Sequence, residues 1–227
     1  MRVAVIRFPG SNCDEDTRRA SEKAGTCAYF VWHRDLTLEG ADVVMLPGGF
    51  AYGDHLRAGA IARFSPIMNA VREHALGGGP TLGICNGFQV LCEAGLLPGA
   101  LVRNAALKFI SRPVTVRVEA TDTPFTTAYS EGAIFDMPVA HGEGRFVAPP
   151  DILDELEAEH QVVLRYLGEN PNGSLRDIAG ITNRERNVVG LMPHPERAAD
   201  PVLGDSRGSG VFDSLLQHAE VLGGGAR

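Results

Sequence analysis

The sequence predicts an α/β protein with a mostly parallel central sheet that is covered by helices on both faces. Short apolar runs alternate with helix-like amphipathic segments along the first half of the chain, which is the pattern of parallel strands joined by crossover helices. The 227 residues are 44% hydrophobic and include no internal repeat or linker. Residues 1–227 are therefore expected to form one domain around one core.

In the first half, turn residues rich in glycine and proline follow the apolar runs. Strands are expected at 3–8, 28–33, 42–46 and 81–84, and helices at 13–24, 63–76 and from 88 to 94. In open α/β sheets, ligands bind beyond the carboxyl ends of the strands. Gly48, Gly49 and Cys85 each follow a predicted strand, so they are candidates for one site.

The second half changes character, because expected strands outnumber helices there. Strands are expected at 113–119, 133–140, 161–167, 178–182 and 188–192, and helices at 151–160 and 210–222. The strands at 178–182 and 188–192 flank the polar turn 183–187, so we expect them to pair.

Cys85 stands between Gly83 and Gly87, where an apolar run gives way to a helical pattern. A strand, a tight turn and a helix, with a thiol at the turn, form the geometry of a nucleophile elbow. The start of a helix also favours the thiolate. The alternative is a buried structural cysteine, which is the commoner role of a free thiol.

Composition and motifs exclude several classes of protein. The net charge of −7 argues against a dedicated nucleic-acid binder, which would show a basic face. No run of about 18 apolar residues is present, so we expect no membrane contact. Neither G-x-x-x-x-G-K-[ST] nor a strand followed by G-x-G-x-x-G occurs, so we expect no nucleotide cofactor on this chain.

The other three cysteines, Cys13, Cys27 and Cys92, form no C-x-x-C pair and have no nearby histidine that completes a zinc pattern. We expect them to behave as small apolar side chains, and we expect no metal site. The first residues read as a strand and not as a signal sequence, which favours a cytoplasmic location with reduced thiols.

His194 is the best candidate for a base beside Cys85. It follows an apolar run and lies between Pro193 and Pro195, which restrict the local backbone. In an extended segment, side chains at i and i+2 point the same way, so Glu196 can reach the imidazole and set its tautomer. A surface turn that holds a histidine and an acid is the alternative.

Backbone and side-chain groups near Cys85 suggest how a substrate could be held. N–H groups of Gly49 and of Asn86, the residue after the thiol, could form an oxyanion hole. Gly48 is a further candidate for substrate binding. Gln89 lies one helical turn after Cys85 and could bind a polar end of the substrate, or it could be an ordinary half-buried residue.

Residues 141–145 combine His141, Glu143 and Arg145 with two glycines. This spacing fits a binding or gating loop. Taken alone, it also fits a solvated turn.

With these residues assembled, the sequence resembles the class I (triad-type) glutamine amidotransferases. Residues 83–89 resemble the nucleophile motif of the family, and His194 and Glu196 match its His-x-Glu pair. Within the family, the segments 47–57, 141–145 and 190–197, and the residues at 172–174 and 178–181, are most similar to the small glutaminase subunits of a purine-biosynthesis synthase. Ala51 and His55 depart from that pattern, which has serine and tyrosine there.

The resemblance implies a flavodoxin-like three-layer fold and a Cys85–His194–Glu196 triad that hydrolyses glutamine through a thioester. It implies partners as well: a large synthetase subunit that uses ATP and Mg²⁺ and receives the ammonia, and a small third subunit. Residues for contact with the synthetase or for gating are Tyr52, Asp54, Arg57, His141, Glu143 and Arg145. The alternatives are an amidotransferase for another acceptor and a stand-alone cysteine hydrolase on the same fold.

Overall fold

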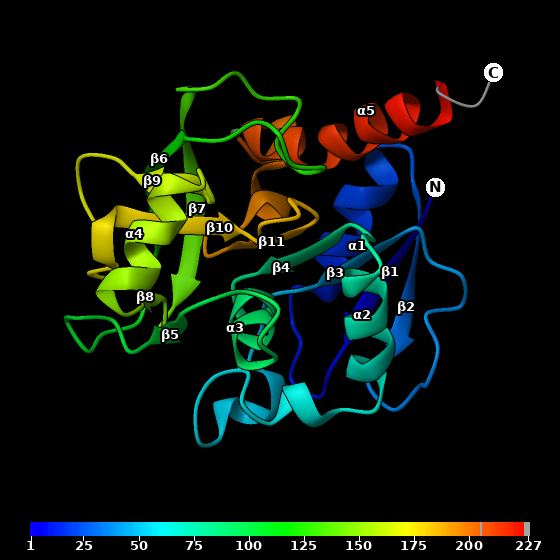
Figure 1. Cartoon of the computed structure of the whole chain (residues 1–227), viewed down its shortest axis with the longest axis horizontal. Coiled ribbons are helices and arrows are strands. Elements are labelled where there is room, and N and C mark those ends of the chain that lie inside the picture. The colour runs from blue at the N-terminus through cyan, green and yellow to red at the C-terminus, as the bar shows by residue number, and fades with distance from the viewer. Residues whose placement is uncertain (205, 225–227) are drawn as a thin grey trace.

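The computed structural model describes residues 1–204 and 206–224, and strands alternate with helices in its first half (Figure 1). The strands are β1 (Arg2–Arg7), β2 (Cys27–Trp32), β3 (Val43–Leu46), β4 (Thr81–Ile84), β5 (Ala100–Val102), β6 (Ile110–Val118), β7 (Ile134–His141), β8 (Arg145–Val147), β9 (Val162–Tyr166), β10 (Ile178–Thr182) and β11 (Val188–Leu191).

Within the described residues, nine strands form one sheet in the order β2-β1-β3-β4-β11-β10-β9-β6-β7. The pairs from β2 to β11 are parallel, and those from β11 to β7 are antiparallel. The remaining two strands, β5 and β8, pair with each other. The α/β fold class is confirmed, as is the predicted pairing of β10 with β11.

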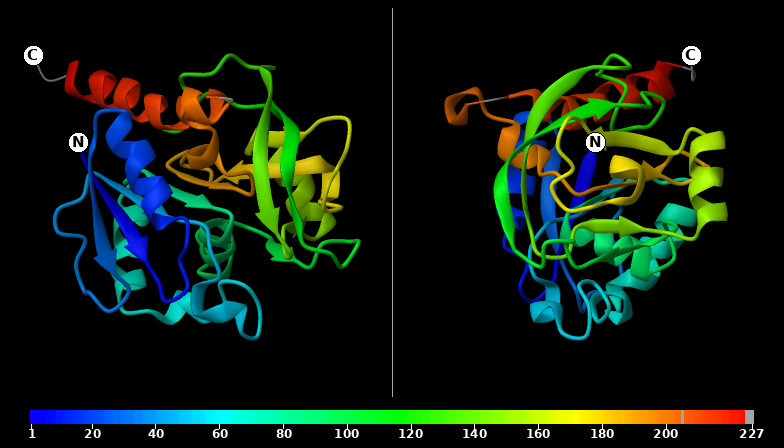
Figure 2. Two further views of the ribbon diagram at one scale, coloured as in Figure 1. Left: turned by 180° about the vertical axis from the view of Figure 1, so that it is seen from behind. Right: turned by 90° about the vertical axis from the view of Figure 1, so that its left-hand side faces the viewer.

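Helices cover both faces of the parallel part of the sheet. The α-helices of the described residues are α1 (Asp14–Lys23), α2 (Ile67–Leu76), α3 (Asn86–Glu93), α4 (Pro150–Ala158) and α5 (Gly210–Gly224), of which α4 lies in front of the antiparallel strands in Figure 1. In Figure 1, α2 and α3 lie in front of the sheet; seen from behind, α1 lies in front of it (Figure 2). No helix in the described ranges is both long and apolar enough to cross a membrane.

Short 3-10 helices occupy several of the connections. They are η1 (Ala51–Asp54), η2 (Ala62–Phe64), η3 (Leu175–Asp177), η4 (Pro195–Ala198), η5 (Pro201–Leu203) and η6 (Arg207–Ser209). The helix expected from residue 63 is divided for this reason, because η2 comes first and α2 begins only at Ile67. Ser65 between them has an extended backbone, as expected for a residue that precedes a proline.

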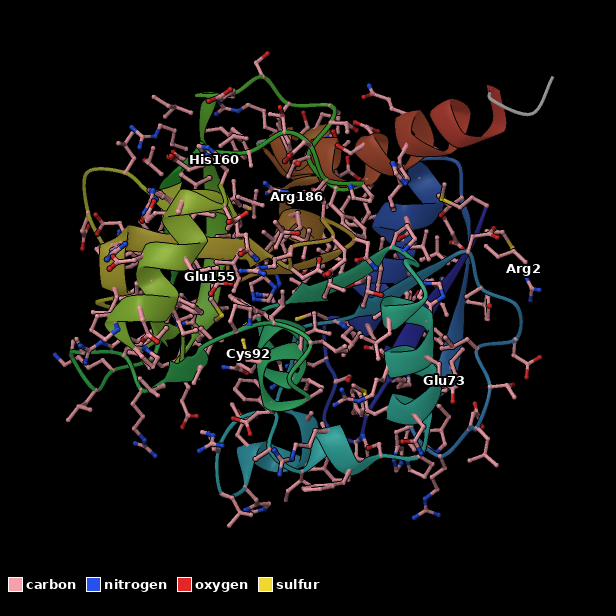
Figure 3. All side chains as sticks on the ribbon, in the orientation of Figure 1. Arg2, Glu73, Cys92, Glu155, His160 and Arg186 are labelled. Atoms are coloured by element: carbon pink, nitrogen blue, oxygen red, sulfur yellow. The ribbon has the colours of Figure 1, made fainter. Side chains whose placement is uncertain are left out.

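The strands β5 and β8 were not predicted, and they connect the two halves of the molecule. Phe146 of β8 stacks on Phe88 of α3, with ring centroids 6.1 Å apart, and both side chains are fully buried. Cys92 also lies on α3 (Figure 3), where it is buried as expected. The core therefore continues from the parallel strands to the β5–β8 pair.

Candidate active site

The carboxyl ends of three neighbouring parallel strands bring the predicted site residues together. β4 pairs with β3 on one side and with β11 on the other, so Gly83 lies beside both Leu46 and Gly190. The segments that follow these strands carry Gly49, Cys85 and His194. Residues that are far apart in the sequence thus meet at one edge of the sheet, as the strand order requires.

Cys85 forms the predicted tight turn between β4 and α3. Its backbone has φ 50° and ψ −104°, a conformation that non-glycine residues rarely adopt. Its N–H donates to the Leu191 carbonyl at 2.6 Å, which fixes the turn to β11. The side chain is 4% exposed, and its sulfur lies 3.8 Å from the Ala140 carbonyl oxygen.

The glycines around Cys85 are required by close packing. A Cβ atom on Gly87 would lie 1.9 Å from the carbonyl oxygen of Leu46, and one on Gly83 would lie 2.6 Å from the backbone of Gly87. A Cβ on Gly190 would lie 2.1 Å from the Phe88 ring. The elbow is therefore packed tightly against both neighbouring strands.

His194 and Glu196 form a buried hydrogen-bonded pair. The His194 Nδ1–H donates to Glu196 Oε1 at 2.6 Å, and both side chains are almost completely buried. The predicted contact is present, but its expected geometry was wrong. Glu196 lies in the first turn of η4 and not in an extended segment, because Pro195 begins a 3-10 helix there. The His194 N–H donates to the Pro138 carbonyl at 2.8 Å, which ties the pair to β7.

The surroundings of His194 favour its protonated form. Burial opposes the charge, but the Glu196 carboxylate and the Cys85 sulfur outweigh burial and raise the pKa of His194 well above its ordinary value. Among the described residues, His194 Nε2 and Glu196 Oε2 are the buried side-chain atoms without a hydrogen-bond partner. Because Glu196 takes Nδ1, Nε2 is the ring nitrogen left for the thiol.

A cavity of about 230 Å³ opens over Cys85. Its walls come from the loops after β3 and β4, from the loop before β6 and from the end of β7. The lining residues are Gly49, Phe50, Asp54, Cys85, Gln89, Arg103, Leu107, Lys108, Phe109, Ala140, His141, Gly142 and Glu143. Gly49 and Gln89 line the cavity, and their contacts with a substrate stay predictions; the wall at 103–109 had not been predicted.

Asn86 and Gln89 connect α3 to two loops of the cavity. Asn86 Oδ1 accepts from the Ala51 N–H at 3.0 Å, and its Nδ2 donates to Gln89 Oε1 at 2.8 Å. Gln89 Nε2 donates to the Glu143 carbonyl oxygen at 2.5 Å. The Gln89 amide is therefore engaged in holding the cavity wall together.

The segment 50–57, expected to contact a partner or to gate the site, has an unusual backbone. Three of its non-glycine residues, Tyr52, Asp54 and Leu56, have positive φ, which costs about 1–3 kcal/mol at each such position. The Tyr52 hydroxyl contacts His33 Nδ1 at 2.6 Å and Ser65 Oγ at 2.8 Å, so Tyr52 anchors the segment.

Asp54 and Glu143 bring two acids to the same side of the cavity. Burial and the nearby Glu143 carboxylate raise the pKa of Asp54 to about 6, although a hydrogen bond from Asn86 lowers it. Glu143 Oε2 accepts from the Ala58 N–H at 3.2 Å, so the loop at 141–145 is tied to the end of the segment 50–57. Arg57 is not a lining residue and pairs with Glu93 at 2.5 Å.

His141 belongs to a buried polar cluster and not to a solvated turn. It is 3% exposed, and Asn104 and Asn172 are buried beside it. Asn104 Oδ1 lies 3.1 Å from His141 Nδ1 and also accepts from the Gly144 N–H. Burial and the neighbouring His194 lower the pKa of His141 to about 4, so His141 is neutral near pH 7. Arg145 donates to the backbone carbonyl at 173.

Cys13 and Arg197 lie next to the His194–Glu196 pair, and the sequence had not predicted a role for either. Arg197 donates to the Cys13 sulfur at 2.9 Å. The expectation that Cys13 is merely apolar is therefore wrong, and Cys27 is exposed. A Cβ on Gly48 would lie 2.7 Å from the His194 ring and 3.2 Å from the Cys13 sulfur. Gly48 is thus packed against the ring and is not a lining residue of the cavity.

One group of side chains in the described ranges has donor atoms close enough to hold a metal ion. The donor atoms of Cys13, His194 and Glu196 lie within 4.8 Å of one another. Arg197 already donates to the sulfur, and Glu196 already accepts from His194 Nδ1. We therefore interpret the group as a hydrogen-bonded cluster that is completed by a guanidinium.

Sequence comparison places this arrangement in a known family. Residues 1–208 match the CobB/CobQ-like glutamine amidotransferase domain. The chain belongs to this family of glutamine amidotransferases, as the resemblance of its sequence had predicted.

Individual relatives show which members of the family this chain is similar to. The phosphoribosylformylglycinamidine synthase subunit PurQ of Rubrobacter xylanophilus is 58% identical over 221 residues, which are 97% of this chain and 100% of that protein. The subunit of the same name from Thermus thermophilus is 56% identical, with 96% of this chain and 98% of that protein covered. A chain in the structure of PurLQS from Thermotoga maritima has a TM-score of 0.89 and 44% identity, with 96% of this chain and 98% of that chain covered.

Proposed function

We propose that this chain is the glutaminase subunit of a phosphoribosylformylglycinamidine synthase. It hydrolyses the side-chain amide of glutamine and delivers the ammonia to an ATP-dependent synthetase subunit in purine biosynthesis. The observation that carries this proposal is the elbow thiol of Cys85 beside the buried His194–Glu196 pair, in a chain that is 58% identical to a subunit of that synthase.

The three side chains divide the steps of amide hydrolysis among them. The Cys85 thiol first gives its proton to His194 Nε2, which leaves a thiolate beside an imidazolium, and the sulfur then bonds to the side-chain carbonyl carbon of glutamine. The C–N bond then breaks, and His194 gives the proton to the leaving nitrogen, which departs as ammonia. Water attacks the thioester and gives a proton to His194. As the C–S bond breaks, the sulfur takes this proton back and glutamate is released.

The charges that develop in these steps have partners at the site. Glu196 balances the imidazolium of His194 at 2.6 Å. The N–H groups of Gly49 and Asn86 donate to the oxyanion of each tetrahedral intermediate. The Asn86 N–H is available for this, because Asn86 begins α3 and the first N–H groups of a helix have no acceptor within the helix. Each such donor contributes about 10²–10³ in rate. Gln89 supports the cavity wall in which the rest of the substrate lies.

The other half of the reaction belongs to partner subunits. ATP and Mg²⁺ bind to the large synthetase, which fits the lack of a nucleotide-binding motif in this sequence. A small third subunit completes the assembly. The complex works in the cytoplasm, and the four free cysteines of this chain are in keeping with a reducing compartment.

Replacement of Cys85 tests the proposal. In the assembled complex, Cys85→Ala should abolish glutamine-dependent amidine synthesis and leave synthesis from added ammonia intact, because the acceptor is activated on another chain. Both rates are measured with the same preparation, and Cys92→Ala is the matched control thiol. Loss of ammonia-dependent synthesis in an assembled Cys85→Ala complex, or full glutamine-dependent synthesis, would overturn the assignment.

A further inference from the structure

A positive charge lies next to the His194–Glu196 pair and is held there by a sulfur atom. The Arg197 guanidinium donates to Cys13 Sγ at 2.9 Å, whereas its Nε is 4.0 Å from Glu196 Oε1. Glu196 Oε2 is buried and has no hydrogen-bond partner. A carboxylate is ordinarily a much stronger acceptor for a guanidinium than a thiol is. The preference of Arg197 for the sulfur is therefore imposed by the surrounding structure.

The position of the sulfur is fixed by the backbone at the start of α1. The Cys13 N–H donates to the Gly48 carbonyl at 3.2 Å, and the Cys13 carbonyl accepts from the Thr17 N–H at 3.0 Å. The thiol itself donates to Asn12 Oδ1 at 3.2 Å, which leaves sulfur lone pairs for Arg197. Cys13 is 1% exposed, so the surrounding atoms hold its sulfur in a fixed position.

Release of the guanidinium toward Glu196 would change the charge that His194 experiences. The unpartnered Oε2 would gain a bidentate or single hydrogen bond from Arg197, since leaving a buried carboxylate oxygen unpaired is unfavourable. The carboxylate would then be partly neutralised, and the imidazolium of His194 would lose support. The thiolate of Cys85 forms together with that imidazolium, so its population would fall as well.

We infer that Cys13 is a positioning residue for the reaction: its sulfur holds the Arg197 guanidinium away from Glu196, so that the carboxylate serves His194 alone. This inference deepens the proposed glutaminase function and rests on it. Cys13 does not line the cavity over Cys85, and its sulfur also lies within 4.8 Å of a donor atom of His194, so the variants below must separate its hold on Arg197 from its direct contact with the ring.

Three variants separate this role from simple packing. Cys13→Ala removes the acceptor, and Cys13→Ser keeps an acceptor in the same place. The double variant Cys13→Ala/Arg197→Met has the same small cavity as Cys13→Ala but lacks the guanidinium that would move. Arg197→Met alone is the reference for the double variant.

The readout is the alkylation rate of Cys85 by iodoacetamide at pH 7, measured by mass spectrometry on the full chain, because it reports the thiolate without any need for glutamine turnover. Cys13→Ala should slow alkylation about tenfold, which corresponds to one pKa unit. Cys13→Ser should stay within about threefold of the parent chain, and the double variant should return to within about threefold of Arg197→Met.

Two results would overturn the inference: a double variant as slow as Cys13→Ala, or a folded Cys13→Ser variant as slow as Cys13→Ala. Glutaminase kcat in the complex with the synthetase should follow the same order, with KM unchanged. Absence of glutamine hydrolysis by the parent complex would instead count against the proposed function, and the alkylation rates would still decide the role of Cys13.

Discussion

Cys85, the nucleophile that we propose, has a strained backbone. Its positive φ of 50° costs about 1–3 kcal/mol, and the hydrogen bond to Leu191 and the packing of Gly83 and Gly87 maintain it. The strain places the thiol in the cavity wall at the start of α3. The conformation is therefore part of how the site works.

Replacing Glu196 by glutamine should reduce glutamine hydrolysis less than replacing His194 by alanine. Glutamine can still accept from Nδ1, but it cannot balance an imidazolium, so the pKa of His194 should fall. Neutralising the acid of a serine triad costs about 10⁴ in rate. We expect a smaller loss here, because a thiol depends less on its base. Steady-state kcat/KM in the assembled complex measures both variants, with Glu155→Gln, which does not line the cavity, as the control. Equal losses would mean that Glu196 acts directly on the reacting atoms.

At the scale of single residues, the sequence predicted the site residues that have glycine or proline neighbours, which act as local markers. Cys85 lies between glycines, and His194 lies between prolines two positions before Glu196. Cys13, Asn104 and Asn172 have no such marker. Their contacts with Arg197 or His141 span between 31 and 184 positions, and no single-sequence pattern encodes such a pairing. The cluster could be found only once the fold had brought these side chains together.

At the scale of elements, the ends of strands that glycine or proline follows were predicted well, and short strands were not. β3 and β4 end close to the expected residues, because Pro47 and Gly83 with Gly87 mark the turns. β5 and β8 have three residues each, too few to show an alternating pattern. The short 3-10 helix η4 was not predicted either, although it determines how Glu196 reaches His194.

η1 and the residues around it are the most strained element beside the cavity, and Asp54 adds an electrostatic cost. Its pKa of about 6 in the folded chain lies above the ordinary value of about 3.9. The folded chain therefore binds this proton more tightly than the unfolded chain does. The contribution of Asp54 to the free energy of unfolding is therefore greatest below about pH 4 and is lost as the pH rises to about 6.

Asp54→Asn should consequently raise the free energy of unfolding at pH 7.5 and raise it by only about half as much at pH 5. The full shift corresponds to about 3 kcal/mol, but Asp54 is only half-buried, and solvent screening reduces the expected gain to about 1 kcal/mol. The amide can still accept from Asn86, so the loop conformation is retained. Urea denaturation at the two pH values tests the prediction. An equal change at both would show that the charge of Asp54 is not responsible.

At the scale of the whole molecule, the antiparallel half of the sheet folds back over the site that the parallel half creates. β7 is the last strand in the sheet order, yet its Pro138 carbonyl accepts from His194 and its Ala140 carbonyl lies 3.8 Å from the Cys85 sulfur. The green strands curve around the molecule in this way in the right panel of Figure 2. β7 leads directly into the loop at 141–145, so both halves contribute to one cavity.

This arrangement suggests how a partner subunit could control hydrolysis. The segment 50–57 follows Gly49, the proposed oxyanion donor, and Glu143 ties the end of that segment to the loop after β7 through the Ala58 N–H. A partner that moves either loop would therefore move the Gly49 N–H. One misplaced oxyanion donor costs about 10²–10³ in rate, which is sufficient for a switch. Such control would be useful, because ammonia released without an acceptor is protonated in water and lost.

We therefore expect the isolated chain to be a poor glutaminase and the nucleotide-loaded synthetase to raise its turnover at least about tenfold, a change of about 1.4 kcal/mol in the barrier. Glu143→Ala should reduce this stimulation more than it reduces the basal rate, because it breaks the link between the two loops. Glu169→Ala is the matched control, since Glu169 pairs with Arg112 and does not line the cavity. Timed glutaminase assays of each chain, alone and with its partners, measure both rates. Full turnover by the chain alone, unchanged when the partners are added, would eliminate the switch and leave the roles of Cys85, His194 and Glu196 intact.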